Sequence, residues 1–113
     1  MDDFKSIWDL LQANLNPGRK IKIWNPYNGY LAEDLTIKST EPQFISIDPP
    51  RVWDTQVIPR DDFEQVWGVW EDYTALHLDQ RKMRSLSEHH KYITSIFRWL
   101  ETEAMPATGE DIL

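Results

Sequence analysis

Histidines and paired carboxylates are the side chains of this sequence whose types could support chemistry. His89 and His90 are adjacent. Neighbouring residues on a helix point about 100° apart and cannot share one metal ion, whereas residues three or four apart can. The acidic neighbour Glu88 gives no partner at that spacing either. The pair therefore predicts solvated histidines beside a basic face rather than a metal site.

Two carboxylate pairs, Asp61/Asp62 and Glu71/Asp72, have the composition of a general acid and base. Such chemistry requires two carboxyl groups whose pKa values are pushed apart by their surroundings. Asp61 and Asp62 stand at the start of a predicted helix, where capping and the helix dipole account for them. Glu71 and Asp72 lie on the face opposite the apolar stripe. We expect structural roles for both pairs.

No serine stands in a G-x-S-x-G elbow, and Ser85, Ser87 and Ser95 lie in or beside predicted helices. Capping or solvent contact explains such serines. Neither G-x-G-x-x-G nor G-x-x-x-x-G-K-[ST] occurs, so no phosphate-cradling loop is predicted. The sequence thus assigns no catalytic, cofactor-binding or metal-binding residue, and we expect a protein that is not an enzyme and needs no cofactor.

Aromatic and arginine residues next to rigid turns form the first candidate contact surface, because these residue types dominate interface energetics. They also suit ordinary turn packing. Trp53 follows two prolines, and we hypothesise that it is exposed. The members of this candidate surface are Trp24, Tyr27, Tyr30, Arg51 and Trp53.

A second candidate surface is a basic face within residues 76–98, comprising Arg84, Lys91 and Arg98. Lys91 and Arg98 are seven residues apart and share one side of the last predicted helix. This half of the chain could imitate a helix-turn-helix that faces phosphate. The helix predicted before it is acidic, however, which disfavours an orientation toward DNA.

The elements that must position these residues follow from apolar spacing. Three stretches place large apolar residues on one helical face. The residues between the first two stretches form about four short runs with the pattern of strands. We predict an α+β fold: an N-terminal helix, an antiparallel meander of three or four strands, and two or three C-terminal helices packed on one sheet face. The helical stretches are Phe4/Ile7/Trp8/Leu11, Phe63/Val66/Trp67/Trp70 and Tyr92/Ile93/Ile96/Phe97/Leu100.

Several local signals define the expected boundaries. Asp2 or Asp3 caps the first helix, and Asn28-Gly29 closes a hairpin after a strand over residues 20–24. Asp61-x-x-Glu64 is a variant of the capping box and predicts a helix that continues to about Tyr73. We expect Gly68, inside that helix, to let another element approach closely. Asp79 caps a short helix, and the last helix begins near Ser87.

Composition is typical of one soluble domain: 113 residues, no cysteine, six tryptophans and a net charge of −7. We expect a single domain over residues 1–103 and a flexible tail over 104–113. The absence of cysteine, the acidic start and the lack of a long apolar run predict a cytoplasmic protein that does not contact membranes. A negative net charge makes nucleic acid an unfavourable partner and a basic protein a favourable one.

Residues 57–67, 70–73 and 92–101 resemble small uncharacterised bacterial proteins of the kind carried on mobile integron gene cassettes. The likeness consists of the segments VIPRDDFEQVW, WEDY and YITSIFRWLE. It implies a bacterial, cytosolic context, an accessory role and plausible dimerisation. It transfers no binding or catalytic residue to any position of this chain.

We therefore expect a small non-catalytic binding protein that self-associates or captures a protein or a small apolar ligand. Two alternatives stay open: a DNA-binding accessory regulator that uses the basic helical segment, and an enzyme whose site is assembled from scattered residues. A pocket holding two polar groups with displaced pKa values would be the structural sign of the enzyme.

Overall fold

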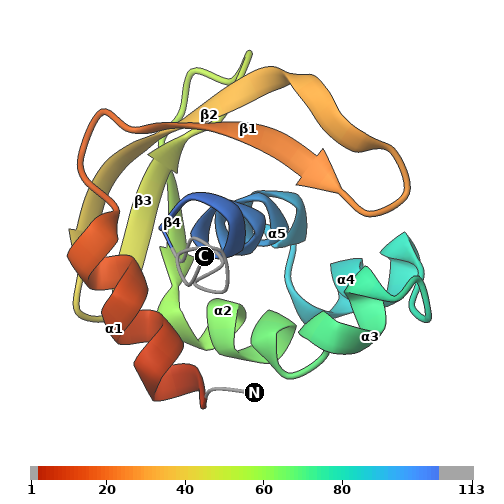
Figure 1. Cartoon of the computed structure of the whole chain (residues 1–113). Coiled ribbons are helices and arrows are strands. Elements are labelled where there is room, and N and C mark those ends of the chain that lie inside the picture. Colours follow the sequence, from red (N-terminus) through yellow and green to blue (C-terminus); the bar gives the residue numbers. More distant parts are fainter. Residues whose placement is uncertain (1–2, 105–113) are drawn as a thin grey trace, which may run out of the picture.

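The computed structural model describes residues 3–104 and has the predicted α+β architecture (Figure 1). An N-terminal helix is followed by four strands and then by the C-terminal helices. The elements are α1 (Phe4–Asn14), β1 (Lys20–Asn25), β2 (Gly29–Glu41), β3 (Phe44–Asp48), β4 (Gln56–Pro59), α2 (Arg60–Trp67), α3 (Trp70–Thr74), α4 (Gln80–Leu86), α5 (His90–Trp99) and the π-helical turn η1 (Leu100–Ala104).

The four strands form one antiparallel sheet in the order β1-β2-β3-β4, which confirms the predicted meander. The sheet curves around α5, and α2, α3 and α4 cover the other side of that helix (Figure 1). Helix α5 is therefore the middle layer of the molecule.

The middle position of α5 explains its apolar stripe. Ile93, Ile96 and Phe97 are fully buried. The Phe97 ring lies 5.4 Å from the Trp70 ring and 5.2 Å from the Trp67 ring, both at steep angles. Edge-to-face aromatic pairs of this kind stabilise a core beyond the area they bury.

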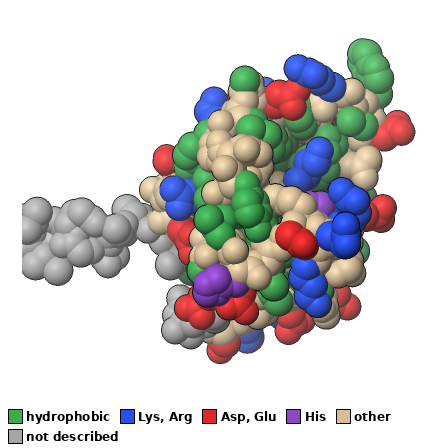
Figure 2. Space-filling view, turned by 90° about the vertical axis from the view of Figure 1, so that its right-hand side faces the viewer, with side chains coloured by type: hydrophobic (Ala, Val, Ile, Leu, Met, Phe, Trp, Pro, Cys, Tyr) green, Lys and Arg blue, Asp and Glu red, His purple; other side chains and the backbone are tan. Residues whose placement is uncertain are grey.

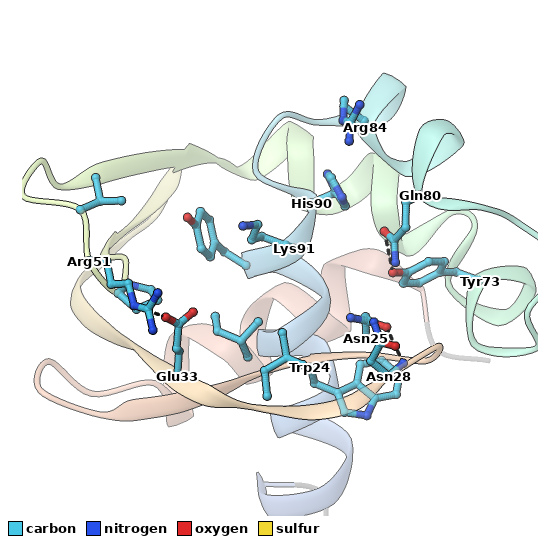
Figure 3. Close-up of a pocket in the computed structure, with 15 residues that line it drawn as sticks. Trp24, Asn25, Asn28, Glu33, Arg51, Tyr73, Gln80, Arg84, His90 and Lys91 are labelled. Atoms are coloured by element: carbon cyan, nitrogen blue, oxygen red, sulfur yellow. Dashed lines mark hydrogen bonds and ion pairs between the residues drawn. The ribbon is translucent and has the colours of Figure 1, made fainter.

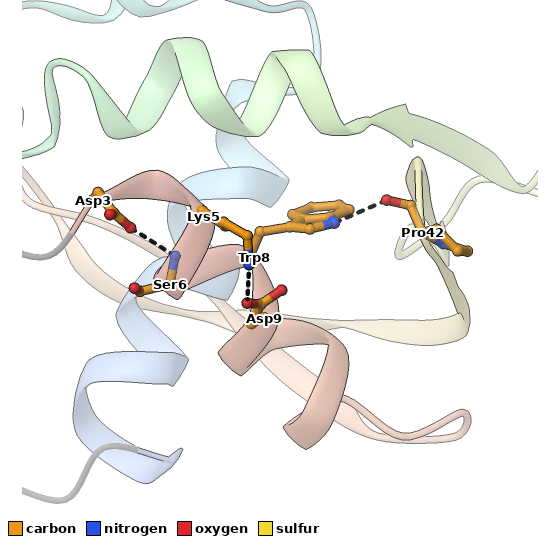
Figure 4. Close-up of polar contacts among 6 residues, drawn as sticks. All are labelled: Asp3, Lys5, Ser6, Trp8, Asp9 and Pro42. Atoms are coloured by element: carbon orange, nitrogen blue, oxygen red, sulfur yellow. Dashed lines mark hydrogen bonds and ion pairs between the residues drawn. The ribbon is translucent and has the colours of Figure 1, made fainter.

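Helix α1 is attached to the β2–β3 turn through Trp8 (Figure 4). The Asp3 carboxylate caps it by accepting from the Ser6 backbone N–H at 2.9 Å, as predicted. The Trp8 indole N–H donates to the Pro42 carbonyl in the β2–β3 turn at 2.9 Å. This bond ties the helix to the sheet, whereas the exposed Lys5–Asp9 ion pair contributes little.

Strand β1 departs from simple alternation, because Ile21, Ile23 and Trp24 are all buried. The register between β1 and β2 shifts between Lys22 and Trp24. At this bulge the Trp24 backbone N–H donates to the hydroxyl of Ser95 on α5 at 2.9 Å. The expectation that capping or solvent contact explains Ser95 is therefore wrong, because its side chain satisfies a buried backbone group of β1.

The long helix expected over residues 61–73 is interrupted. Helix α2 ends at Trp67, Gly68 and Val69 form a turn, and α3 begins at Trp70. The predicted capping box is also wrong, because Pro59 is the N-cap and no side chain caps α2. Asp62 instead accepts from the Ser87 hydroxyl at 2.8 Å, so this acidic residue links α2 to the α4–α5 connection.

The expectation for Gly68 is also wrong. A side chain at this position would meet only backbone oxygens of α2, at 3.5 and 3.7 Å, and no other element. The glycine marks the end of α2 rather than a close approach.

Other boundary predictions are confirmed. The Asp79 carboxylate caps α4 by accepting from the Lys82 N–H, and Gly29 has a positive φ in the β1–β2 hairpin. Ala104 belongs to η1, and the remaining residues of the expected tail, 105–113, lie outside the described part of the chain. Among the described residues no helix is long and apolar enough to cross a membrane.

Candidate functional site

An open groove of about 520 Å³ lies between the sheet and the helices (Figure 3). Strands β1 and β2 supply its floor. The β3–β4 loop bounds one end, and α3, α4 and the start of α5 bound the other. Figure 2 shows that Lys and Arg side chains gather around this hollow. The lining residues are Ile23, Trp24, Asn25, Asn28, Leu31, Glu33, Pro50, Arg51, Val52, Tyr73, Gln80, Arg84, His90, Lys91 and Tyr92.

One end of the groove carries hydrogen-bonding side chains. The Tyr73 hydroxyl donates to the Gln80 side-chain oxygen at 3.1 Å. This bond joins α3 to the first residue of α4. Burial raises the pKa of Tyr73, so its phenol stays protonated at neutral pH. On the β1–β2 hairpin, the Asn25 side-chain oxygen accepts from the backbone N–H groups of Tyr27 and Asn28, each at 2.8 Å. These bonds hold the hairpin tip in one conformation.

The helical wall carries Arg84, His90 and Lys91 (Figure 3). Burial lowers the pKa of His90, and the positive charges of Arg84 and Lys91 lower it further. The imidazole is therefore neutral at pH 7. Its Nδ1 lies 3.2 Å from the Ser87 carbonyl, which favours a proton on Nδ1 and leaves Nε2 as an acceptor.

The opposite end of the groove is formed by Arg51 and Glu33, which make an ion pair. Arg51 has a φ of 65°, in the left-handed region that is costly for a residue with a side chain. Leu31, Val52 and Tyr92 add apolar side chains to the lining, and Leu31 and Val52 are exposed.

The structure brings four of the predicted site residues into this one groove: Trp24, Arg51, Arg84 and Lys91. They come from both candidate surfaces, the aromatic turns and the basic face. Trp24 contributes only an edge, because it is 7% exposed and its ring packs 6.1 Å from the Trp70 ring.

The remaining predicted residues lie outside the groove. Arg98 stacks on the Trp24 and Tyr30 rings at 4.9 and 5.9 Å, and its Nε donates to the Tyr30 hydroxyl at 3.4 Å. Tyr27 donates its hydroxyl to the Leu78 carbonyl. Trp53 is fully exposed, as hypothesised. The basic face is thus divided, with Arg98 separated from Arg84 and Lys91.

Several groove residues were not predicted as site residues, among them Glu33, Tyr73, Gln80, His90 and Tyr92. From its place in the adjacent pair His89-His90, the sequence predicts that His90 is solvated. That prediction is wrong for both members of the histidine pair, because His90 is half-buried and the His89 side chain is only 12% exposed. Within residues 3–104 no group of three or more His, Asp or Glu side chains is placed to hold a metal ion.

A second hollow of about 460 Å³ lies between β1 and the end of α5. Its lining includes Arg19, which lies 5.4 Å above the Trp99 ring, and Tyr30, which already binds Arg98. Arg19 and Tyr30 thus already have partners within the fold.

No family model, curated protein or solved structure matches the chain.

Proposed function

We propose that this protein is a non-catalytic binding module and that the groove between the hairpin, the β3–β4 loop and the helices is its ligand site. A volume of about 520 Å³ is in the range of small-molecule pockets, about 300–1,000 Å³. The lining combines apolar side chains with a few polar groups from separate elements, which is the composition that orients a ligand. The convergence of two strands, the β3–β4 loop and three helices on one groove is the observation that carries the proposal.

The hydrogen bonds along the rim support a preformed site. Tyr73 and Gln80 hold each other, Asn25 holds the hairpin tip, and Arg51 is paired with Glu33. Side chains that are already ordered lose little conformational entropy when a ligand binds.

Chemical-shift mapping with a library of small organic fragments tests the proposal. We expect the fragments that bind to shift the backbone amides of Leu31, Val52 and Lys91. Leu31→Trp places a large ring in the groove and should abolish these shifts. Val57→Trp is the matched control, because Val57 is exposed on β4 and does not line the groove. Shifts that survive Leu31→Trp, or that cluster elsewhere, would contradict the proposal.

A second candidate function is catalysis through His90. The groove holds three groups with displaced pKa values, Tyr73, His90 and Tyr92, which is the sign expected of an enzyme. Both tyrosine pKa values are raised, so these phenols do not become bases, and the Glu33 carboxylate is engaged by Arg51. Within the groove His90 is thus left as a lone base. Mass spectrometry of bound fragments separates the candidates: a binding module returns each fragment unchanged, and an enzyme does not.

A further inference from the structure

We propose that the groove takes a small organic anion with an aromatic ring, and that Arg84 and Lys91 hold its carboxylate or phosphate group. This inference rests on the proposed function, since it names the ligand class of the same site.

The charge of the groove is opposite to that of the chain. Arg51, Arg84 and Lys91 line it together with one carboxylate, Glu33, so two positive charges are in surplus while the whole chain carries −7. Because Glu33 pairs with Arg51, the surplus belongs to Arg84 and Lys91. An acidic protein that places cations without carboxylate partners in a groove attracts anions to that place.

Arg84 is available for a ligand. Within the described part of the chain its guanidinium makes no hydrogen bond, ion pair or ring contact, although carboxylates are abundant on the surface. The Lys91 ammonium lies 5.7 Å from the Tyr92 ring and has no carboxylate partner among residues 3–104. The two cations lie on the same helical wall, Arg84 from α4 and Lys91 from α5 (Figure 3). Charge-assisted bonds from a guanidinium and an ammonium to one anionic group are strong and specific.

His90 adds a neutral group to this wall. Its Nδ1 faces the Ser87 carbonyl, and its two charged neighbours in the groove are Arg84 and Lys91. An anion bound between Arg84 and Lys91 would offset the repulsion that these two cations exert on a proton at His90. The imidazole can therefore accept from a protonated ligand or, after gaining a proton, donate to an anion.

The aromatic part of the ligand follows from the adjacent apolar surface. Tyr92 is partly buried beside Lys91, while Leu31 and Val52 are 38% and 45% exposed on the neighbouring strand and loop. These apolar side chains line the same groove as the cations. A flat ring with a short acidic arm matches this lining, because the ring can contact the apolar side chains while the arm faces Arg84 and Lys91.

Nucleic acid fits the same observations less well. A polyanion requires a continuous basic surface, whereas Arg98 lies apart from the other two cations and stacks on Trp24 and Tyr30. The overall negative charge opposes a long polyanion more than a single small anion.

Calorimetry with three probes of one ring system tests the charge preference: indole-3-acetate, indole-3-acetamide and tryptamine. We expect the anion to bind about tenfold more tightly than the amide, as one charge-assisted contact provides, and the cation to bind weakest. Arg84→Gln and Lys91→Gln should each remove most of that preference and leave amide binding unchanged. Arg81→Gln is the matched control, because Arg81 is on α4, exposed and outside the groove.

The outcomes are distinguishable. Equal binding of all three probes at the groove would overturn the anion preference and leave the proposed function in place. No binding of any probe would count against both. An anion preference that Arg81→Gln reduces as much as Arg84→Gln would also overturn the inference, because it would reflect net charge rather than the groove.

Discussion

Ser95 joins the middle helix to the bulge in β1. Its hydroxyl accepts from the Trp24 backbone N–H at 2.9 Å and donates to the Lys91 carbonyl at 2.7 Å. Ser95→Ala leaves the buried N–H without a partner, so we expect a loss of about 1–3 kcal/mol in the free energy of unfolding. Chemical denaturation measures it. Ser85→Ala, an exposed serine, should change stability by less than about 0.5 kcal/mol; equal effects would refute the role of Ser95.

His90 gives the stability a defined pH dependence. The pKa of its imidazole is lower in the folded protein than in the unfolded chain, mainly because it is buried. The unfolded state therefore binds a proton first as pH falls, and the His90 contribution to stability decreases from the ordinary histidine pKa down to the lowered one. His90→Gln should flatten this part of the profile. NMR titration checks the cause, and an ordinary or raised pKa for His90 would contradict it.

Two glycines, one at a helix end and one in the β1–β2 hairpin, differ in backbone conformation. Gly68 ends α2 with φ −61° and ψ −20°, and a methyl group there meets only ordinary contacts. Gly68→Ala should therefore stabilise the protein by about 0.4–1 kcal/mol, because the unfolded chain loses freedom. Gly29 has φ +73° in the hairpin, so Gly29→Ala should destabilise by about 1–2 kcal/mol. Thermal unfolding measures both, and changes of the same sign would be inconsistent with these backbone conformations.

Trp70, the first residue of α3, contributes more to the core than Trp67, the last residue of α2. Trp70 is 3% exposed, packs against Trp24 and Phe97, and donates its indole N–H to the Glu101 carboxylate at 2.9 Å. Trp67 is only partly buried. We expect Trp70→Ala to cost about 3–5 kcal/mol and Trp67→Ala to cost less. Denaturation curves compare them, and the reverse order would contradict the packing.

At the scale of elements, the sequence predicts well which helices and strands form and in what order they follow one another. The alternation in β1, the turn at Asn28-Gly29 and the stripe of α5 are local patterns, and each gives the correct element. The break at Gly68 was not predicted, because Trp67, Trp70 and Tyr73 keep helical spacing across it. The cap of α2 was misassigned by two residues, since Asp61 and Asp62 resemble caps but occupy the first turn.

The molecule buries three of its six tryptophans, Trp8, Trp24 and Trp70, leaves Trp67 and Trp99 partly buried, and exposes one. Trp53 is fully exposed beside Val52, on the loop that borders the groove. Trp53→Phe should remove the component of tryptophan fluorescence most accessible to acrylamide, with no loss of stability. Trp70→Phe is the control and should not change that component. If Trp53 instead mediates the self-association expected from the sequence, light scattering will show a dimer that Trp53→Phe dissociates.

The candidate site was beyond sequence reasoning for a physical reason. Its residues come from β1, β2, the β3–β4 loop and three helices, so no window of the sequence contains a recognisable part of it. Residue type did identify Trp24, Arg51, Arg84 and Lys91 as candidates. Only the curvature of the sheet and the packing of α4 against α5 place them around one hollow and exclude Arg98.

The most direct test of the central claim is a measurement of nuclear Overhauser contacts between bound indole-3-acetate and the protein. Ligand ring protons should contact the Leu31 and Val52 methyl groups and the Tyr92 ring, with the acetate arm toward Arg84 and Lys91. Contacts to Trp99 and Ile21, which line the second hollow, or none at all, would contradict the account.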